Sequence, residues 1–283
     1  MRLILVTALT MLAFAANSLL NRLALVEGGI DALTFGTVRL LSGAMMLALL
    51  ALVLRRGLRL GGRGHIVGVV SLLVYIYGFS SAYTVLDAGI GALILFGAVQ
   101  ITMFAGALLG GEQPLPQRSF GAVLAFAGLV WLLWPGGAVS VSPLHGALMA
   151  AAGAAWGIYS LAGRGAVDPL AATAANFILA APFGLGLTLV TAGASGLTAA
   201  APLGLGLAVT SGAVTSALGY LLWYGVLPRL ERSVAAVAQL TVPVIALMGG
   251  LVFLGEVPTL TFVLAAVVVL GGVALSVVPQ RRR

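Results

Sequence analysis

Charged side chains are scarce in this chain, and its long apolar stretches contain almost none. Only 7% of the 283 residues are charged, and seven of these are acidic. No acidic residue lies near the middle of an apolar stretch, whereas Arg39 does lie inside one. The groups left to do chemistry there are amides, hydroxyls and aromatic rings. Such groups bind a solute through hydrogen bonds and ring faces. We therefore expect a binding site, and no enzyme activity.

Neutral polar and aromatic residues recur at helical spacing in the apolar stretches. Thr10, Phe14, Asn17 and Asn21 lie four, three and four residues apart, which places them on one face of a helix. Polar groups in a membrane helix are costly and usually turn away from lipid, so we expect a central cavity. Packing between helices is the alternative role for each residue. The candidate solute contacts are Asn17, Tyr77, Ser81, Gln100, Trp156, Tyr159, Gln239 and Arg39.

Two faces of the segment 71–84 compete for the cavity. One face has Tyr77 and Ser81, and the other has Ser71 and Tyr75. We prefer the Tyr77 face because it is more polar. Counted from the ends of their predicted helices, Tyr77 and Trp156 both lie near the middle of the membrane, so we expect them to contact the solute. The remaining aromatics are interpreted as an interfacial belt: Trp131, Trp134, Tyr83, Trp223 and Tyr224.

Arg39 leaves two interpretations open. It could bind the carboxylate of a solute, or it could pair with helix ends or with Asp31. We favour the pairing with Asp31 or helix ends, because at about 1.5 Å per residue Arg39 lies only about 12 Å from the outer boundary. Pro182 and Pro243 lie at mid-membrane in their stretches, where proline interrupts the backbone hydrogen bonds, and we predict hinges there.

Composition places the chain in a bilayer as an all-α membrane protein. It is 61% hydrophobic, and about 20 apolar residues suffice to cross the hydrocarbon core. Short polar segments separate the apolar stretches and predict ten transmembrane helices, at 3–26, 32–54, 65–87, 90–110, 119–135, 144–163, 170–192, 203–226, 233–254 and 259–278. The first stretch resembles a secretory signal peptide. It also matches the sixth stretch in sequence, so we interpret it as a transmembrane helix.

The basic residues are all arginine, and their placement predicts an orientation. With the N-terminus in the cytoplasm, twelve of the 14 arginines lie on the cytoplasmic side and only Arg22 lies outside. Both termini are thus predicted to be cytoplasmic, in the inner (plasma) membrane of a bacterium. The net charge of +7 belongs to this asymmetry, so we expect no nucleic-acid partner.

The chain contains an internal repeat. Residues 91–114 return as residues 235–258, so Gly111, Glu112 and Pro114 align with Gly255, Glu256 and Pro258 at an offset of 144. Each half has five helices, an odd number, so the halves 1–140 and 141–283 are inverted relative to each other. Inverted repeats are the common plan of secondary transporters. For the two glutamates we prefer an interfacial cap of the following helix to a buried proton carrier.

Two five-helix halves that each close on Gly-Glu-x-Pro, with the segment 221–256, resemble the EamA-type drug/metabolite transporters. The resemblance covers nearly the whole chain. Length, the segment 71–77 and Trp156 resemble the YddG-type amino-acid exporters in particular. One departure is Val99, which stands where the second half has Pro243.

The apolar stretches lack carboxylates and clustered cations, and this restricts the chemical class of the solute. Proton-driven export of cationic drugs needs a carboxylate at membrane depth, and sugar phosphates need clustered cations. A small neutral solute remains, such as phenylalanine, methionine or threonine, exported by alternating access without metal or cofactor. Efflux of another neutral metabolite or a hydrophobic drug is the alternative. An intramembrane protease is excluded because His65 and His145 lie at helix ends, away from Ser80. The oligomeric state stays open, with a monomer possible.

Overall fold

The regular structure of the chain is helical wherever the computed structural model describes it. The described residues are 2–54, 57–58, 60, 64–111, 116–134, 141–163, 168–226, 229–230 and 238–277. The helices are α1 (Arg2–Val26), α2 (Ala32–Val53), α3 (Gly64–Ala82), α4 (Ala88–Leu109), α5 (Pro116–Leu133), α6 (Pro143–Gly163), α7 (Pro169–Ala199), α8 (Pro202–Thr210), η1 (Ser211–Leu218), α9 (Gly219–Val226), α11 (Thr241–Leu254) and α12 (Leu260–Val277).

Ten of the described helical segments correspond to the ten predicted spans. Eight are long and apolar enough to cross a membrane, and the segment from Pro202 to Trp223 counts as one of them. The shorter apolar helices α11 and α12 complete the set. The chain is therefore an all-helical, multi-pass membrane protein, as predicted.

Two spans, the third and the eighth, depart from their predicted form in ways that bear on the site. The third span ends at Ala82 instead of residue 87, because the chain turns there, with Tyr83 and Leu86 buried and Thr84 and Val85 exposed. The eighth span is α8, η1 and α9 in succession, and η1 is a π-helix. Such wider turns are rare and occur frequently at functional sites.

The two predicted proline hinges have different surroundings. Pro182 lies inside α7, yet the non-helical backbone of α7 is at Gly193, with φ 66°. The departure from helical geometry in α7 is thus further along the chain than predicted. Pro243 is the third residue of α11, where a missing N–H costs no helical hydrogen bond. It marks the start of a helix.

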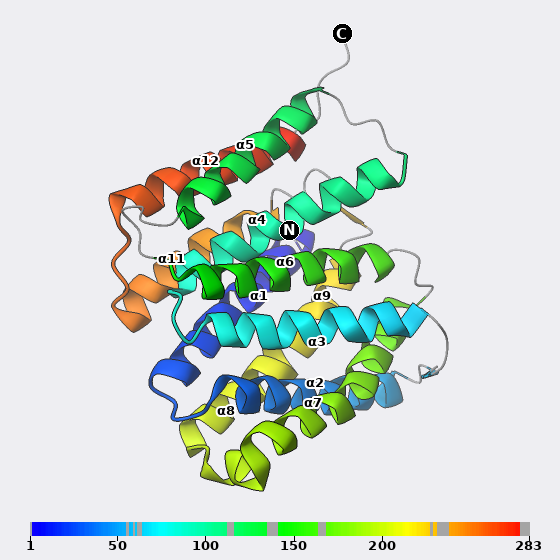
Figure 1. Cartoon of the computed structure of the whole chain (residues 1–283). Coiled ribbons are helices and arrows are strands. Elements are labelled where there is room, and N and C mark those ends of the chain that lie inside the picture. The colour runs from blue at the N-terminus through cyan, green and yellow to red at the C-terminus, as the bar shows by residue number, and fades with distance from the viewer. Residues whose placement is uncertain are drawn as a thin grey trace.

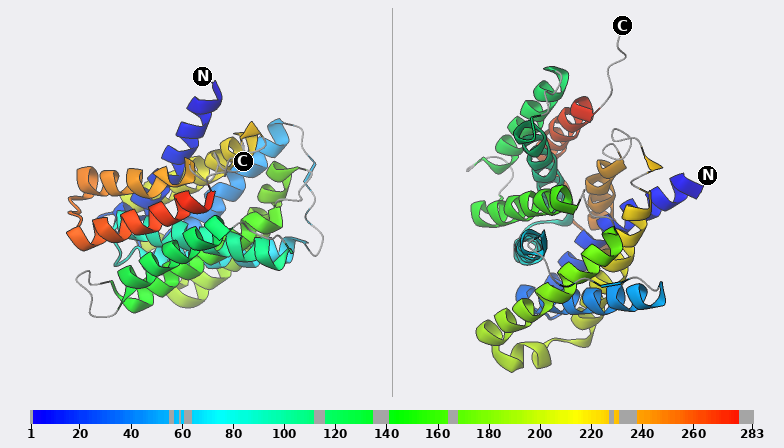
Figure 2. Two further views of the ribbon diagram at one scale, coloured as in Figure 1. Left: turned by 90° about the horizontal axis from the view of Figure 1, so that it is seen from above. Right: turned by 90° about the vertical axis from the view of Figure 1, so that its right-hand side faces the viewer.

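The helices form a bundle with a central group and two outer groups (Figure 1). α5 and α12 lie side by side at one edge, and α2, α7 and α8 lie at the opposite edge. Between them, α6 packs against both α3 and α4, and α11 packs between α1 and α4. The views in Figure 2 show the same grouping, with the first turns of α1 extending beyond the other helices.

Glycine allows the close approach of α4 and α6. A Cβ at Gly153 would collide with the carbonyl oxygen of Leu95 and lie 2.7 Å from Cβ of Ala98. Gly157, one turn on, packs in the same way against Thr102. Small residues at such positions let membrane helices pack backbone to backbone.

We expect Gly153→Ala to destabilise the protein by about 1–3 kcal/mol, because the backbone of α4 cannot move aside as a side chain can. Gly186→Ala is the matched control, since a Cβ there meets nothing within 4 Å. Thermal unfolding of the purified proteins in detergent measures both. An equal or smaller loss at Gly153 than at Gly186 contradicts the assigned packing.

Candidate solute-binding site

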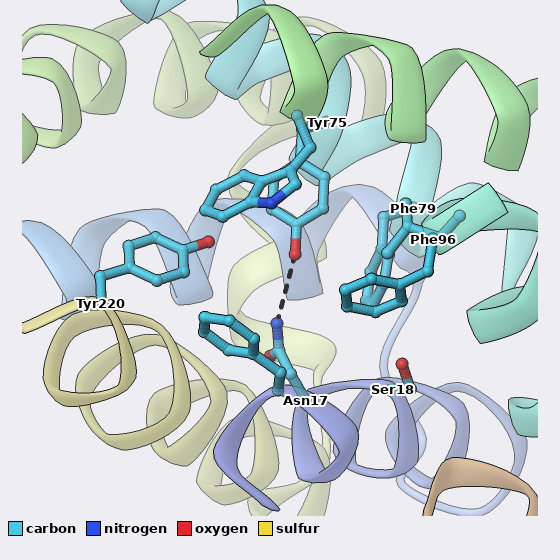
Figure 3. Close-up of a pocket in the computed structure, with 9 residues that line it drawn as sticks. Asn17, Ser18, Tyr75, Phe79, Phe96 and Tyr220 are labelled. Atoms are coloured by element: carbon cyan, nitrogen blue, oxygen red, sulfur yellow. Dashed lines mark hydrogen bonds between the residues drawn. The ribbon is translucent and has the colours of Figure 1, made fainter. Parts of the chain in front are cut away.

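A small cavity lies in the central group of helices (Figure 3). Its volume is about 20 Å³, which is room for about one water molecule. None of its lining residues is charged. They are Phe14, Asn17, Ser18, Tyr75, Phe79, Leu95, Phe96, Trp156 and Tyr220.

Aromatic rings form most of the wall of this cavity. Trp156 lies at its centre, with ring centroids 5.0 Å from Tyr75 and 4.8 Å from Tyr220. On the other side Trp156 stacks on Tyr159 at 5.4 Å. Offset and edge-on rings of this kind attract one another beyond the area they bury. The wall is therefore a connected aromatic cluster from α1, α3, α6 and α9, and Phe96 of α4 lines the same cavity.

Asn17 is the polar centre of the cavity. Its side-chain nitrogen donates to the hydroxyl of Tyr75 at 3.5 Å, as Figure 3 shows. Its side-chain oxygen accepts from Ser211 at 2.5 Å and from Thr215 at 3.0 Å. Both hydroxyls belong to η1, so the π-helix presents two donors to one oxygen of α1.

Arg39 lies directly behind this network and is fully buried. Its Nε donates to the hydroxyl of Ser216 at 3.1 Å, and its Nη2 donates to the hydroxyl of Tyr75 at 3.0 Å. The guanidinium also lies 5.1 Å from the ring centroids of both Tyr75 and Phe79. Cation–π attraction of this kind stabilises a desolvated arginine.

The favoured interpretation of Arg39 named Asp31 as one of two kinds of partner, and the pairing with Asp31 is wrong. The carboxylate of Asp31 accepts the backbone N–H groups of Leu33 and Thr34, both at 3.0 Å, and so caps the start of α2. Among the described residues, Arg39 has no acidic partner within ion-pair distance.

Two of the predicted contacts lie in the cavity wall, Asn17 and Trp156. Tyr159 lies behind Trp156, and its hydroxyl accepts from Asn176 at 3.4 Å. Gln100, Gln239 and Ser81 are only partly buried and do not line the cavity.

Tyr77 lies on the other side of α3, away from the cavity. Its hydroxyl is 2.7 Å from that of Thr37, next to Gly184 of α7. The preferred face of α3 therefore points to α2 and α7, while Tyr75 occupies the cavity.

Sequence reasoning weighed the Tyr75 face of α3 and preferred the Tyr77 face, and it did not consider the hydroxyls of η1 or Tyr220. The sequence does have a pattern for the η1 hydroxyls, because Ser211 and Thr215 lie four residues apart in the eighth span. The polar and aromatic stripes considered earlier left that span out.

Of the residues interpreted as an aromatic belt, two are exposed and two are buried. Trp131 and Trp134 are exposed on the outside of the bundle. Tyr83 is fully buried, and its hydroxyl donates to the carbonyl of Ala88 at 3.2 Å. Trp223 is also buried, with its ring 6.0 Å from that of Phe14. The side chain of Tyr224 lies outside the described residues.

A second polar group, which we call the Arg22 cluster, lies where α1 ends. It consists of Arg22, Asp87 and Glu256. Nε of Arg22 is 3.2 Å from Glu256, and its Nη2 is 3.4 Å from Asp87. Its Nη1 donates to the carbonyls of Tyr83 and Thr84. One side chain thereby joins α1 to the α3–α4 and α11–α12 connections.

Glu256 caps a different helix from the predicted one. Its Oε2 accepts the N–H of Ala88, the first residue of α4, at 2.8 Å. The following helix, α12, is preceded by Thr259, whose hydroxyl accepts from the N–H of Phe262. Glu112 and Pro114, its counterparts in the first half, lie outside the described residues.

Burial raises the pKa of Glu256, and nearby Asp87 adds to this, although the Ala88 N–H and Arg22 oppose it. The folded protein therefore binds a proton here more readily than the unfolded chain. The stability from this group is fully present below the ordinary value of 4.5 and is lost as pH rises through the raised pKa.

We expect the unfolding temperature of the wild type, relative to that of Glu256→Gln, to increase as pH is lowered from about 7 to about 5. Both proteins keep all the other titrating groups, so the contribution of those groups to the pH dependence cancels in the comparison. A difference that shrinks on acidification contradicts the assigned environment.

The described residues contain no group of three or more His, Asp or Glu side chains that could hold a metal ion. What they contain is a small aromatic chamber with no charged residue in its wall, inside a bundle of apolar helices, and a separate Arg22 cluster where α1 ends. This arrangement is that of a membrane transporter.

Comparison with known proteins agrees. The model of the EamA-like transporter family matches residues 144–278. An uncharacterized protein of Pseudomonas aeruginosa is 48% identical over 283 residues, covering 100% of this chain and 96% of that protein. A crystal structure of a protein with 20% sequence identity superposes with a TM-score of 0.66, covering 97% of this chain and 96% of the other. The chain belongs to the EamA-like transporter family.

Proposed function

We propose that the protein is a secondary transporter of the bacterial inner membrane that exports small neutral amino-acid-like solutes by alternating access. The observation that carries this proposal is the central cavity, with an aromatic wall and Asn17 as its polar centre. Phenylalanine, methionine and threonine each have a zwitterionic head for polar contacts and a side chain for the rings.

Alternating access is supported by the size of the cavity and by the Arg22 cluster. The cavity has room for about one water molecule, less than an amino acid needs, and we infer that the helices separate during transport. The arginine asymmetry assigns the Arg22 cluster to the outer face. We infer that this cluster holds α1, α4 and α11 together when the outer side is closed.

Inverted repeats are supported by matched contacts between the halves. The contact of α3 with α6 has its counterpart in α1 with α8 and η1, and the contact of α4 with α6 has its counterpart in α11 with α1. The family model also covers one five-helix half by itself.

The sequence repeats the charges of the Arg22 cluster as well. Arg22, Asp87 and Glu256 align with residues of the same sign in the other half. These are Arg164, Glu231 and Glu112, and they lie outside the described residues.

Within the family, we place the protein with the YddG-type amino-acid exporters. Trp156 lies in the cavity wall, and the segment 71–77 contributes Tyr75 to the same wall. These are the two places on which that resemblance depends.

The test is flux from proteoliposomes loaded with labelled phenylalanine, methionine and threonine, with and without a pH gradient. We expect faster release than from protein-free liposomes, and no requirement for the gradient because no carboxylate lies in the cavity wall. Equal release from both kinds of liposome ends the amino-acid proposal. Release of a labelled hydrophobic drug, without amino-acid flux, assigns the chamber to drug efflux.

A further inference from the structure

Arg39 has hydrogen-bonding capacity that the described protein groups do not use. A guanidinium has five N–H donors in a planar fork. Nε and Nη2 each meet a hydroxyl, but Nη1 is buried and has no hydrogen-bond partner. A buried cation without a counter-charge is costly inside a membrane protein, so such arginines commonly mark a functional site.

Tyr75 connects this arginine with the cavity. Its ring forms part of the cavity wall, while its hydroxyl accepts from Nη2 of Arg39 and from Asn17. Phe79, which lines the cavity too, packs against the same guanidinium. The charge of Arg39 is therefore one side chain away from the chamber.

Building on the proposed function, we infer that Arg39 binds the carboxylate of the transported solute. When the chamber opens and Tyr75 turns aside, the carboxylate takes the place of the Tyr75 hydroxyl at Nη2. Its second oxygen then accepts from the unused Nη1. This two-bond pairing is the geometry in which arginine holds carboxylates most strongly.

The substrate class follows from this charge. The site selects solutes with one carboxylate and an apolar or aromatic body, amino acids among them. Amines without a carboxylate are rejected, because Arg39 repels them and the cavity wall has no acidic residue to offset it. Ser216 keeps the guanidinium in place through Nε during the exchange.

Three ligands that share one phenyl body test the assignment: phenylalanine, 3-phenylpropionate and phenethylamine. The readout is the rise in unfolding temperature of purified protein on adding each ligand, compared among the wild type, Arg39→Lys, Arg39→Gln and the exposed control Arg118→Gln. We expect phenylalanine and 3-phenylpropionate, but not phenethylamine, to stabilise the wild type and the control.

Arg39→Gln is expected to weaken the binding of phenylalanine and 3-phenylpropionate at least tenfold. This variant should also no longer discriminate against phenethylamine. Arg39→Lys keeps the charge and so keeps the preference, with weaker binding because the paired geometry is lost. Size-exclusion profiles of the unliganded proteins establish that each variant is folded. If Arg39→Gln does not fold, the ligand preference of the wild type and of Arg39→Lys decides.

Equal stabilisation of the wild type by the amine overturns the inference, and so does an unchanged preference in Arg39→Gln. In either case flux of amino acids can persist, and the proposed function then stands without this subsite. Absence of any amino-acid flux in the wild type is the separate result that removes the proposed function.

Discussion

Replacing Arg22 by glutamine is expected to open the outer face of the protein. The chain has no cysteine, so Ser18→Cys places a single thiol in the wall of the buried cavity. We expect an impermeant thiol reagent, added from outside, to modify this cysteine at least about tenfold faster when Arg22→Gln is also present. Tenfold corresponds to about 1.4 kcal/mol. Loss of one arginine that binds two carboxylates and two carbonyls can supply that much.

Arg118→Gln is the matched control for this experiment, because it removes an exposed arginine of α5 that lies far from the Arg22 cluster in sequence. It should leave the modification rate unchanged. If the two arginine variants react alike, or if Arg22→Gln reacts no faster than its parent, the cluster does not hold the outer side closed.

Trp156→Ala is expected to abolish most transport and to destabilise the protein. The indole contacts Tyr75, Tyr159 and Tyr220, so its removal opens the centre of the aromatic cluster. Truncation of a buried tryptophan costs about 3–5 kcal/mol. We expect flux to fall at least about tenfold, together with a lower unfolding temperature.

Trp134→Ala is the control, because that ring is 64% exposed. Trp156→Phe separates solute contact from stability, since it retains a ring in the core. We expect it to recover most of the unfolding temperature while altering the order of preference among phenylalanine, methionine and threonine. Normal flux in folded Trp156→Ala would remove this residue from the binding site.

The spans could be predicted because each needs a long apolar run, and polar residues separate the runs. The end of α3 could not be found in this way. Tyr83 and Leu86 continue the apolar run, yet they lie in a turn and their side chains are buried in the protein. Hydropathy does not distinguish a turn covered by protein from another turn of helix.

Two residues of the cavity wall were predictable, and the rotation of α3 was not. Asn17 and Trp156 were expected to contact a solute, and both line the cavity. Tyr75 and Tyr77 are two residues apart and point to different sides of α3, and protein lies against both sides. Tyr77 meets α2 and α7, whereas Tyr75 meets α1 and α6. The number of polar residues on each face of α3 cannot show which face lines the cavity, because the helices on both sides bind a tyrosine hydroxyl.

The wider winding of η1 has a mechanical consequence for the eighth span. A return of Ser211–Leu218 to ordinary α-helical winding would turn α9 about its own axis relative to α8. Tyr220, which follows directly in α9, would turn with it. The inner wall of the chamber can then change shape by a local twist, while α8 stays seated against α2.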